Sequence, residues 1–291
     1  MKKHISLLLC AILLSACLGG CSTQKTCDIA VTTMPVYTFT TKLCAGTDLT
    51  VERIVTENIS CLHDYTLQID QMRKIQGADV LVQSGAGLED FLEDALRVVH
   101  SVIDASSDLS LLEDEHEHDH DYGHAHENDP HIWLSPENAK VMAQNICGGL
   151  IDIFPAYAHV FNANLESLLA ELDALQLYGE QTLSSLTSRE IITFHDGFTY
   201  FAESFDLTIL KAVEEESGAE ASAGELIELA EIITEHQLRA VFTERNGSVS
   251  AANILTKETG VRLYTLDMAM GDNDYFTAMY HNINTIREAL G

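Results

Sequence analysis

The sequence predicts an α/β protein of two lobes, each with a four-stranded parallel sheet flanked by helices, joined by one long rigid helix. Its 291 residues are enough for two lobes that each bury a core. In both halves, short β-branched runs alternate with helical patterns, an order typical of parallel sheets with crossover helices. A long amphipathic pattern separates the two halves and predicts the joining helix.

Each half contains four predicted strands with predicted helices between them. The strands of the first half span 28–33, 49–55, 79–83 and 98–103, and its helices span 37–44, 66–76 and 88–96. The strands of the second half span 191–194, 207–211, 240–243 and Arg262–Leu266, and its helices span 198–205, 223–236, 249–259 and Tyr275–Leu290. The second half therefore repeats the scheme of the first.

The joining helix is read from apolar residues that recur mostly three or four positions apart after Pro155. They are Phe161, Leu165, Leu168, Leu172, Leu175, Leu183 and Leu186. A helix over 159–186 would be about 40 Å long. A core helix of a single domain is the alternative, but its length and its place between two complete halves favour a strut. We expect an N-terminal lobe over 27–155, a linking helix over 156–187 and a C-terminal lobe over 188–291.

The N-terminus predicts a lipoprotein signal peptide over residues 1–20. Lys2 and Lys3 precede an apolar run over 5–14, which is too short to span a bilayer. Two overlapping lipidation boxes end at Cys17 and Cys21, and Cys21 is favoured because Gly20 precedes it and a polar spacer over 21–26 begins there. An ordinary secretory signal is the alternative. The prediction is an extracytoplasmic protein, lipid-anchored to the outer face of the plasma membrane or in the periplasm.

Export would place the remaining cysteines in an oxidising compartment. Cys27, Cys44, Cys61 and Cys147 could form one or two disulfides, or stay as free buried thiols. Spacing alone does not decide the pairing.

The chain is strongly acidic, with 45 acidic against 16 basic residues and a formal charge of −29. Such a surface repels nucleic acid and anionic lipid and concentrates cations. It argues against a nucleic-acid partner, while many soluble proteins carry a similar charge for solubility alone.

The segment 113–129 stands out by composition. It combines carboxylates with five histidines, His116, His118, His120, His124 and His126, and has almost no apolar residue. It is predicted to be a mobile loop, because it has no surface to bury. Alternation of imidazoles and carboxylates predicts several weak cation sites, with a plain solvated loop as the alternative. Its H-E-x-x-H match is rejected as a protease motif, which needs a helix with an apolar face.

Four further residues occupy positions where ligands gather. His63 follows the second strand, His131 follows the fourth strand and the histidine-rich loop, His195 ends the first strand of the second half, and Asp267 ends its last strand. Singly, such residues are usually hydrogen-bonded histidines or helix caps. Ligands of open α/β sheets bind outside the carboxyl ends of the strands, so two residues from each lobe can meet in one cleft. Three imidazoles and one carboxylate make a tetrahedral shell for a metal ion.

Two acidic residues, Asp64 and Asp196, directly follow two of these histidines. They could orient the imidazole N–H groups, or they could cap the helices that follow.

Several short phrases of the mature chain are distinctive. The most specific is the run from Asp129 to Pro136, DPHIWLSP, and the others are TMP, HDY, HDGFTYF and FTE. With these phrases the chain resembles the zinc and manganese solute-binding lipoproteins of ABC importers. The resemblance implies two four-stranded parallel lobes joined by a rigid helix, with the metal between them and little movement on loading. The family's ligand positions fall on His63, His131, His195 and Asp267. The resemblance also implies a permease as partner, a membrane anchor and a monomer.

The metal is predicted from the third ligand position. Manganese binders of the family tend to have Glu there, whereas this chain has His195, and a third imidazole favours Zn²⁺ over Mn²⁺. Mn²⁺ remains the alternative. The chain departs from the family after Asp267, where Met-Ala-Met-Gly replaces the usual Pro and Leu-Gly. Water or another carboxylate could therefore take the fourth position.

Two rival classes differ in what the metal does. A zinc hydrolase needs an open coordination position and a general base, and the sequence has neither a nucleophile elbow nor a metalloprotease helix. A metal-dependent adhesion or sensing lipoprotein would use a structural ion, without which it should not fold. Capture and delivery without catalysis is the favoured function.

Overall fold

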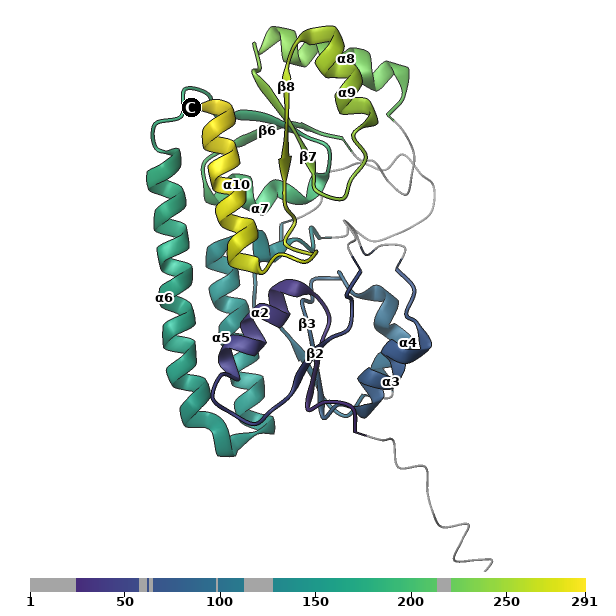
Figure 1. Ribbon diagram of the computed structural model, residues 1–291, viewed down its shortest axis with the longest axis vertical. Coiled ribbons are helices and arrows are strands. Elements are labelled where there is room, and N and C mark those ends of the chain that lie inside the picture. Colours follow the sequence, from purple (N-terminus) through teal and green to yellow (C-terminus); the bar gives the residue numbers. More distant parts are fainter. Residues whose placement is uncertain (1–24, 58–61, 63–64, 98, 113–127, 214–220) are drawn as a thin grey trace, which may run out of the picture.

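The computed structural model describes residues 25–57, 62, 65–97, 99–112, 128–213 and 221–291 (Figure 1). The first lobe contains β1 (Ile29–Val31), β2 (Val51–Arg53), β3 (Val80–Gln83) and β4 (Val102–Asp104), all parallel in the order β2-β1-β3-β4. The second contains β5 (Glu190–Thr193), β6 (Thr208–Ala212), β7 (Ala240–Glu244) and β8 (Arg262–Leu266), parallel in the order β6-β5-β7-β8. The predicted fold class is confirmed.

The helices also follow the sequence pattern in most places. They are α2 (Met34–Leu43), α3 (Ile69–Gly77), α4 (Glu93–Leu96), α5 (Pro136–Ile153), α6 (Ala158–Leu183), α7 (Thr199–Ser204), α8 (Ala223–Glu235), α9 (Ser250–Thr259) and α10 (Tyr275–Leu290). The long helix α6 is present as predicted, and the sequence had set no bounds for α5, which begins at a Ser135 cap followed by Pro136.

The prediction of a helix over 88–96 is wrong in its first half. Only a 3₁₀ turn (Asp90–Leu92) and the single turn α4 form there. Gly85, Ala86 and Gly87 all have positive φ, between 55° and 86°, so the chain turns sharply after β3 before any helix can begin.

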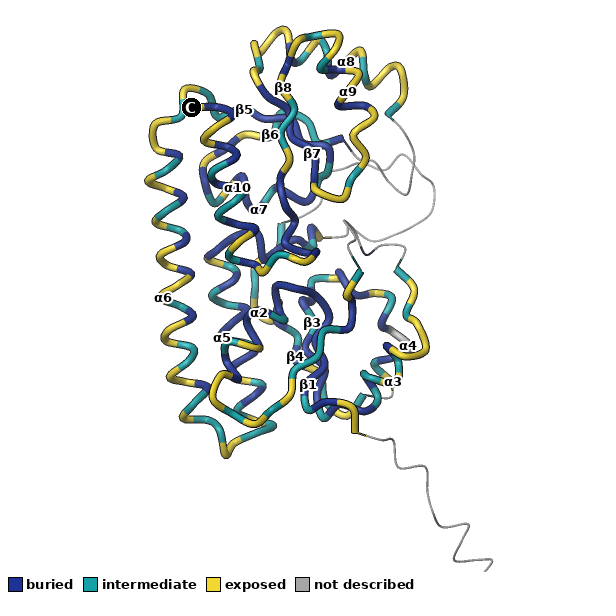
Figure 2. The backbone as a smooth tube through the Cα atoms, viewed as in Figure 1, coloured by how far each residue is buried: buried dark blue, intermediate teal, exposed yellow. Residues whose placement is uncertain are grey.

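The lobes are held together by side-chain packing as well as by the connecting helix α6. In Figure 1, α6 runs beside α5 along one side of the molecule, and α2 and α10 pack against α6. One continuous apolar cluster includes Phe39 of α2, Phe161 of α6 and Tyr275 of α10, and the Phe39 and Tyr275 ring centroids are 4.9 Å apart. Figure 2 shows this buried interior extending through both lobes. A continuous core resists bending between the lobes, because packed interiors are not continuously deformable. The predicted lobe boundaries stay a prediction.

The described cysteines Cys27, Cys44 and Cys147 are buried free thiols, and Cys61 lies outside the described residues. Burial raises the pKa of the Cys44 thiol to about 12, which keeps it protonated and unreactive. The lipidation candidates Cys17 and Cys21 and the predicted signal peptide also lie outside the described residues.

No helix in the described ranges is long and apolar enough to cross a bilayer.

Glu89 is a buried carboxyl at the carboxyl end of the first sheet. It accepts hydrogen bonds from the Thr32 hydroxyl (2.6 Å) and from the Ser84 and Gly85 backbone N–H groups (2.7 and 3.0 Å). Burial nevertheless raises the pKa of Glu89 to about 7, since desolvation outweighs these hydrogen bonds. The folded protein therefore binds this proton more tightly than the unfolded chain does.

This raised pKa predicts a pH-dependent stability. A raised carboxyl pKa contributes stability that is fully present below the unfolded value and is lost as pH rises through about 7. At about 1.4 kcal/mol per pH unit, the loss approaches about 3 kcal/mol. We expect the difference in unfolding free energy between wild type and Glu89→Gln to fall by about this amount from pH 5 to pH 8, measured by urea unfolding. Exposed Glu166→Gln is the control, and a pH-independent Glu89 difference would contradict the prediction.

Candidate metal centre

Two imidazoles from different lobes meet at the centre of the molecule. His131 precedes the 3₁₀ turn (Ile132–Leu134) that leads into α5, and His195 lies two residues after β5. Their Nε2 atoms are 3.4 Å apart, and their ring planes are nearly perpendicular at 87°. Two histidines on one tetrahedral zinc ion, each with a Zn–N distance of about 2.0–2.1 Å, have nitrogens roughly 3.3–3.4 Å apart. The pair therefore has the spacing of two ligands of one ion.

The second nitrogen of each ring faces a buried carboxylate. His131 Nδ1 is 2.8 Å from Asp129 Oδ1, which also accepts from the His131 backbone N–H at 2.9 Å. His195 Nδ1 is 3.9 Å from Glu244 Oε2. A carboxylate behind a histidine holds the N–H on the far nitrogen and leaves the near one as the ligand atom. The Asp129 contact orients His131 with its Nε2 toward His195. Glu244 lies near His195 Nδ1, but 3.9 Å is too long for a hydrogen bond that would fix that ring.

These carboxylates were not the ones expected from the sequence. Asp64 lies outside the described residues, and Asp196 Oδ1 is 3.6 Å from His195 Nε2, the nitrogen that faces His131. Asp129 had been assigned to the mobile loop, yet it is only 9% exposed. Its place two residues before His131 is the one local signal that could have identified it. Glu244, at the end of β7, was marked only as the last residue of the FTE phrase of the resemblance.

Residues of both lobes pack closely around His131. A Cβ at Gly197 would lie 2.7 Å from both His131 Cε1 and Met268 Cε, so glycine is needed for these three residues to approach. The fully buried Trp133 packs edge-to-face on His131 with ring centroids 5.4 Å apart, and its indole N–H donates to the Met268 carbonyl at 2.9 Å. The first lobe thereby contacts the loop that carries Asp267.

Asp267 is held by other partners than the imidazoles. Its Oδ2 accepts from Arg245 Nε and from Asn273 Nδ2, both at 2.8 Å, and its Oδ1 accepts from the Ala269 backbone N–H at 2.9 Å. Among the residues that the structure describes, no three His, Cys, Asp or Glu side chains are grouped so that they could hold a metal ion. His63 lies outside those residues. The four-ligand set stays a prediction.

The loop after Asp267 contains an unusual backbone conformation. Ala269 has a left-handed backbone with φ of 59°. Besides the Trp133 bond to Met268, the Arg53 guanidinium donates to the Gly271 carbonyl at 2.8 Å. The first lobe therefore holds this loop at two carbonyls.

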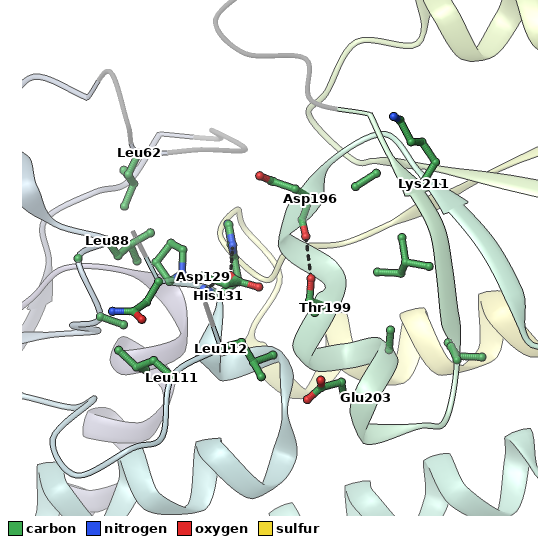
Figure 3. Close-up of a pocket in the computed structure, with 18 of the residues that line it drawn as sticks. Leu62, Leu88, Leu111, Leu112, Asp129, His131, Asp196, Thr199, Glu203 and Lys211 are labelled. Atoms are coloured by element: carbon green, nitrogen blue, oxygen red, sulfur yellow. Dashed lines mark hydrogen bonds and ion pairs between the residues drawn. The ribbon is translucent and has the colours of Figure 1, made fainter. Parts of the chain in front are cut away.

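A cavity of about 1200 Å³ opens beside His131 between the lobes (Figure 3). Its walls combine leucines of the first lobe, among them Leu62 and Leu88, with polar side chains of the second, among them Asp196 and Lys211. His131 is one of the residues that line it.

The five loop histidines lie outside the described residues, but the ends of their segment are placed. The Asp129 N–H donates to the Leu112 carbonyl at 3.0 Å, and the Tyr200 hydroxyl accepts from Leu112 N–H at 2.9 Å. The histidine-rich segment therefore leaves and rejoins the fold next to His131.

The fold and this site define a two-lobed α/β binding protein with a candidate metal centre where the lobes meet. The chain belongs to the family of the zinc-uptake complex component A, periplasmic (ZnuA), whose model matches residues 29–289. This family assignment confirms the resemblance read from the motifs.

Individual relatives agree with the family. The zinc-binding lipoprotein AdcA of Streptococcus pneumoniae is 31% identical over 98% of this chain and 61% of that protein, so the chain spans about three fifths of AdcA. A putative metal-binding protein of Treponema pallidum is 28% identical over 86% of this chain and 83% of its own. A crystal structure of ZnuA superposes with a TM-score of 0.81 at 29% identity, covering 91% of this chain and 99% of that one.

Proposed function

We propose that this protein captures one zinc ion between its lobes and delivers it to the permease of an ABC importer. The observation that carries the proposal is the His131–His195 pair, whose Nε2 atoms are 3.4 Å apart and whose far nitrogens face buried carboxylates. Membership of the zinc-uptake family and the similarity to the zinc-binding lipoprotein AdcA support zinc as the cargo. His63 and Asp267 are proposed to complete the ligand set.

Each ligand group has a physical task. Neutral imidazoles offer nitrogen lone pairs to a borderline metal, and Asp129 keeps the N–H on the opposite side of the His131 ring. The shared core holds the lobes in one arrangement, so His131 and His195 face each other before the ion arrives. The chain's own residues thus bind and orient the ion, and the proposal assigns them no catalytic step.

The remaining parts of the proposal follow from the sequence. We place the protein outside the cytoplasm as a monomer, lipid-anchored through Cys21 or, as the alternative, Cys17. His116, His118, His120, His124 and His126 would supply weak accessory sites on the segment between Leu112 and Asp129. These sites would raise the local concentration of the ion at the mouth of the cleft.

A competition titration tests the metal assignment. We expect the wild-type protein to bind one Zn²⁺ tightly and to prefer it over Mn²⁺ by at least about 100-fold, because imidazole ligands suit zinc. In His195→Glu, a carboxylate replaces the third imidazole, and this preference should shrink. Chelator competition of both metals against both proteins measures the two ratios. A wild-type preference for manganese would contradict the assignment.

Melting curves separate transport from a structural metal. A receptor that releases its cargo should stay folded with chelator present and gain stability with zinc by ligand linkage. A protein that unfolds in chelator would point to the adhesion or sensing alternative instead. Sustained turnover of hydrolase substrates by the zinc-loaded protein would contradict the non-catalytic function.

A further inference from the structure

We propose that Arg245 competes with the cargo ion for Asp267. The Arg245 guanidinium pairs with the Asp267 carboxylate and thereby lowers the affinity of that carboxylate for the metal. The inference rests on the proposed function and adds a residue to it. Arg245 Nε donates to Asp267 Oδ2 at 2.8 Å in a pair that links the carboxyl ends of neighbouring strands. The pair therefore lies on the same sheet edge as the candidate metal centre.

Strand register brings the two residues together. β7 and β8 are parallel, and Glu244 is paired with Leu266. Arg245 and Asp267 are the next residue on each strand, so their side chains emerge side by side at the carboxyl ends. Glu244, the residue before Arg245, is the carboxylate that faces His195. Arg245 is thus built into the same corner as the imidazole pair.

Most hydrogen-bond acceptor sites of the Asp267 carboxylate are already occupied. It accepts from Arg245 and Asn273 on Oδ2 and from the Ala269 N–H on Oδ1, which uses three of about four acceptor sites. A metal ion that binds Asp267 must use the last site beside a permanent positive charge, or displace the guanidinium. In both cases Arg245 opposes binding, because two cations share one carboxylate.

The two partners differ in freedom of movement. The Asp267 side chain is 4% exposed, and Asn282 fixes its backbone through bonds of 2.7 and 2.8 Å. The Arg245 side chain is 47% exposed. Arg245 is therefore the partner that can swing away into solvent while Asp267 stays in place. This asymmetry suits an ion that must be both bound and released.

The test is zinc affinity and stability of Arg245→Gln in the full chain. We expect the zinc dissociation constant to fall at least about tenfold, because the competing charge is gone. The melting temperature of the metal-free protein should fall, because buried Asp267 loses its counter-ion. The rise in melting temperature on adding zinc should grow. A purely structural arginine would lower the melting temperature without tightening zinc binding, and that result would overturn the proposal.

Three variants sharpen the result. Arg262→Gln removes the same charge at the other end of β8, about 16 Å from Asp267 at 3.3 Å per residue, and should leave zinc affinity unchanged. Arg245→Lys keeps a cation and should stay near wild type, and it serves if the Gln variant does not fold. In Asp267→Asn, Arg245→Gln should no longer tighten zinc. Tightening that persists there would overturn direct competition.

The outcomes also separate this inference from the proposed function. Wild-type protein that fails to bind zinc tightly contradicts zinc capture itself. Wild-type binding with an unchanged dissociation constant in Arg245→Gln contradicts only the role of Arg245.

Discussion

His131→Ala is expected to weaken zinc binding on the order of 1,000-fold, more than the 10–100-fold typical of losing an outer partner of a ligand. The imidazole is 4% exposed, faces the His195 Nε2 at 3.4 Å, and is held from behind by Asp129. Alanine removes the donor atom. Chelator competition with zinc measures the loss, and circular dichroism checks that the fold is kept.

Two further variants separate the ligand from its support. Asp129→Asn keeps the His131 ring but replaces the carboxylate behind it, so zinc affinity should fall by about 10–100-fold. His236→Ala removes a histidine at the C-terminus of α8, whose Nδ1 lies 3.1 Å from Glu190, and should not change zinc affinity. Equal affinity of His131→Ala and wild type would exclude His131 as a ligand.

Trp133→Ala is expected to lower the unfolding free energy by about 3–5 kcal/mol, the usual cost of deleting a large buried aromatic side chain. Trp133 is fully buried, packs against His131, and donates across the lobe interface to the Met268 carbonyl. Its loss should also weaken zinc binding, because both the His131 ring and the Asp267 loop lose a neighbour. Urea unfolding and chelator competition measure the two effects.

Trp133→Phe isolates the hydrogen bond. It keeps much of the apolar contact and leaves the Met268 carbonyl without its donor, so about 1–3 kcal/mol should be lost. Leu177→Ala on α6, where the side chain is 52% exposed, is the control and should change stability little. If Trp133→Ala were as stable as this control, the indole could not be the link between the lobes.

The sequence predicted the elements well where local pattern decides them. The predicted strand segments overlap all eight strands, although the segment 98–103 meets β4 only at its last two residues. β1, β3 and β7 are largely buried, as expected for central strands of parallel sheets. The spacing of leucines placed α6, since one face of that helix meets the core. The helix predicted over 88–96 failed because backbone turns at 85–87 and the buried bonds of Glu89 hold that segment, and neither follows from periodicity.

The candidate site was predicted in part. His195 at the end of a strand and His131 after the fourth strand and the histidine-rich loop were predicted to meet, and the structure brings them together. The identity of their supporting carboxylates was not predictable. Asp129 belongs by composition to the histidine-rich run, and Glu244 reaches His195 only because β5 and β7 are neighbours in the sheet.

By itself, the sequence determined the two-lobed α/β class, the joining helix and the histidines on which the zinc proposal depends, because hydrophobic period and motif are local properties. The tertiary structure decided that the lobes share one continuous apolar cluster, that Asp129 holds His131 from behind, and that Glu244 lies near His195. It also decided that Asp267 meets Arg245. The register of β7 and β8 creates that contact between residues 22 apart in the sequence. Because Asp267 is buried, loss of its positively charged partner is costly.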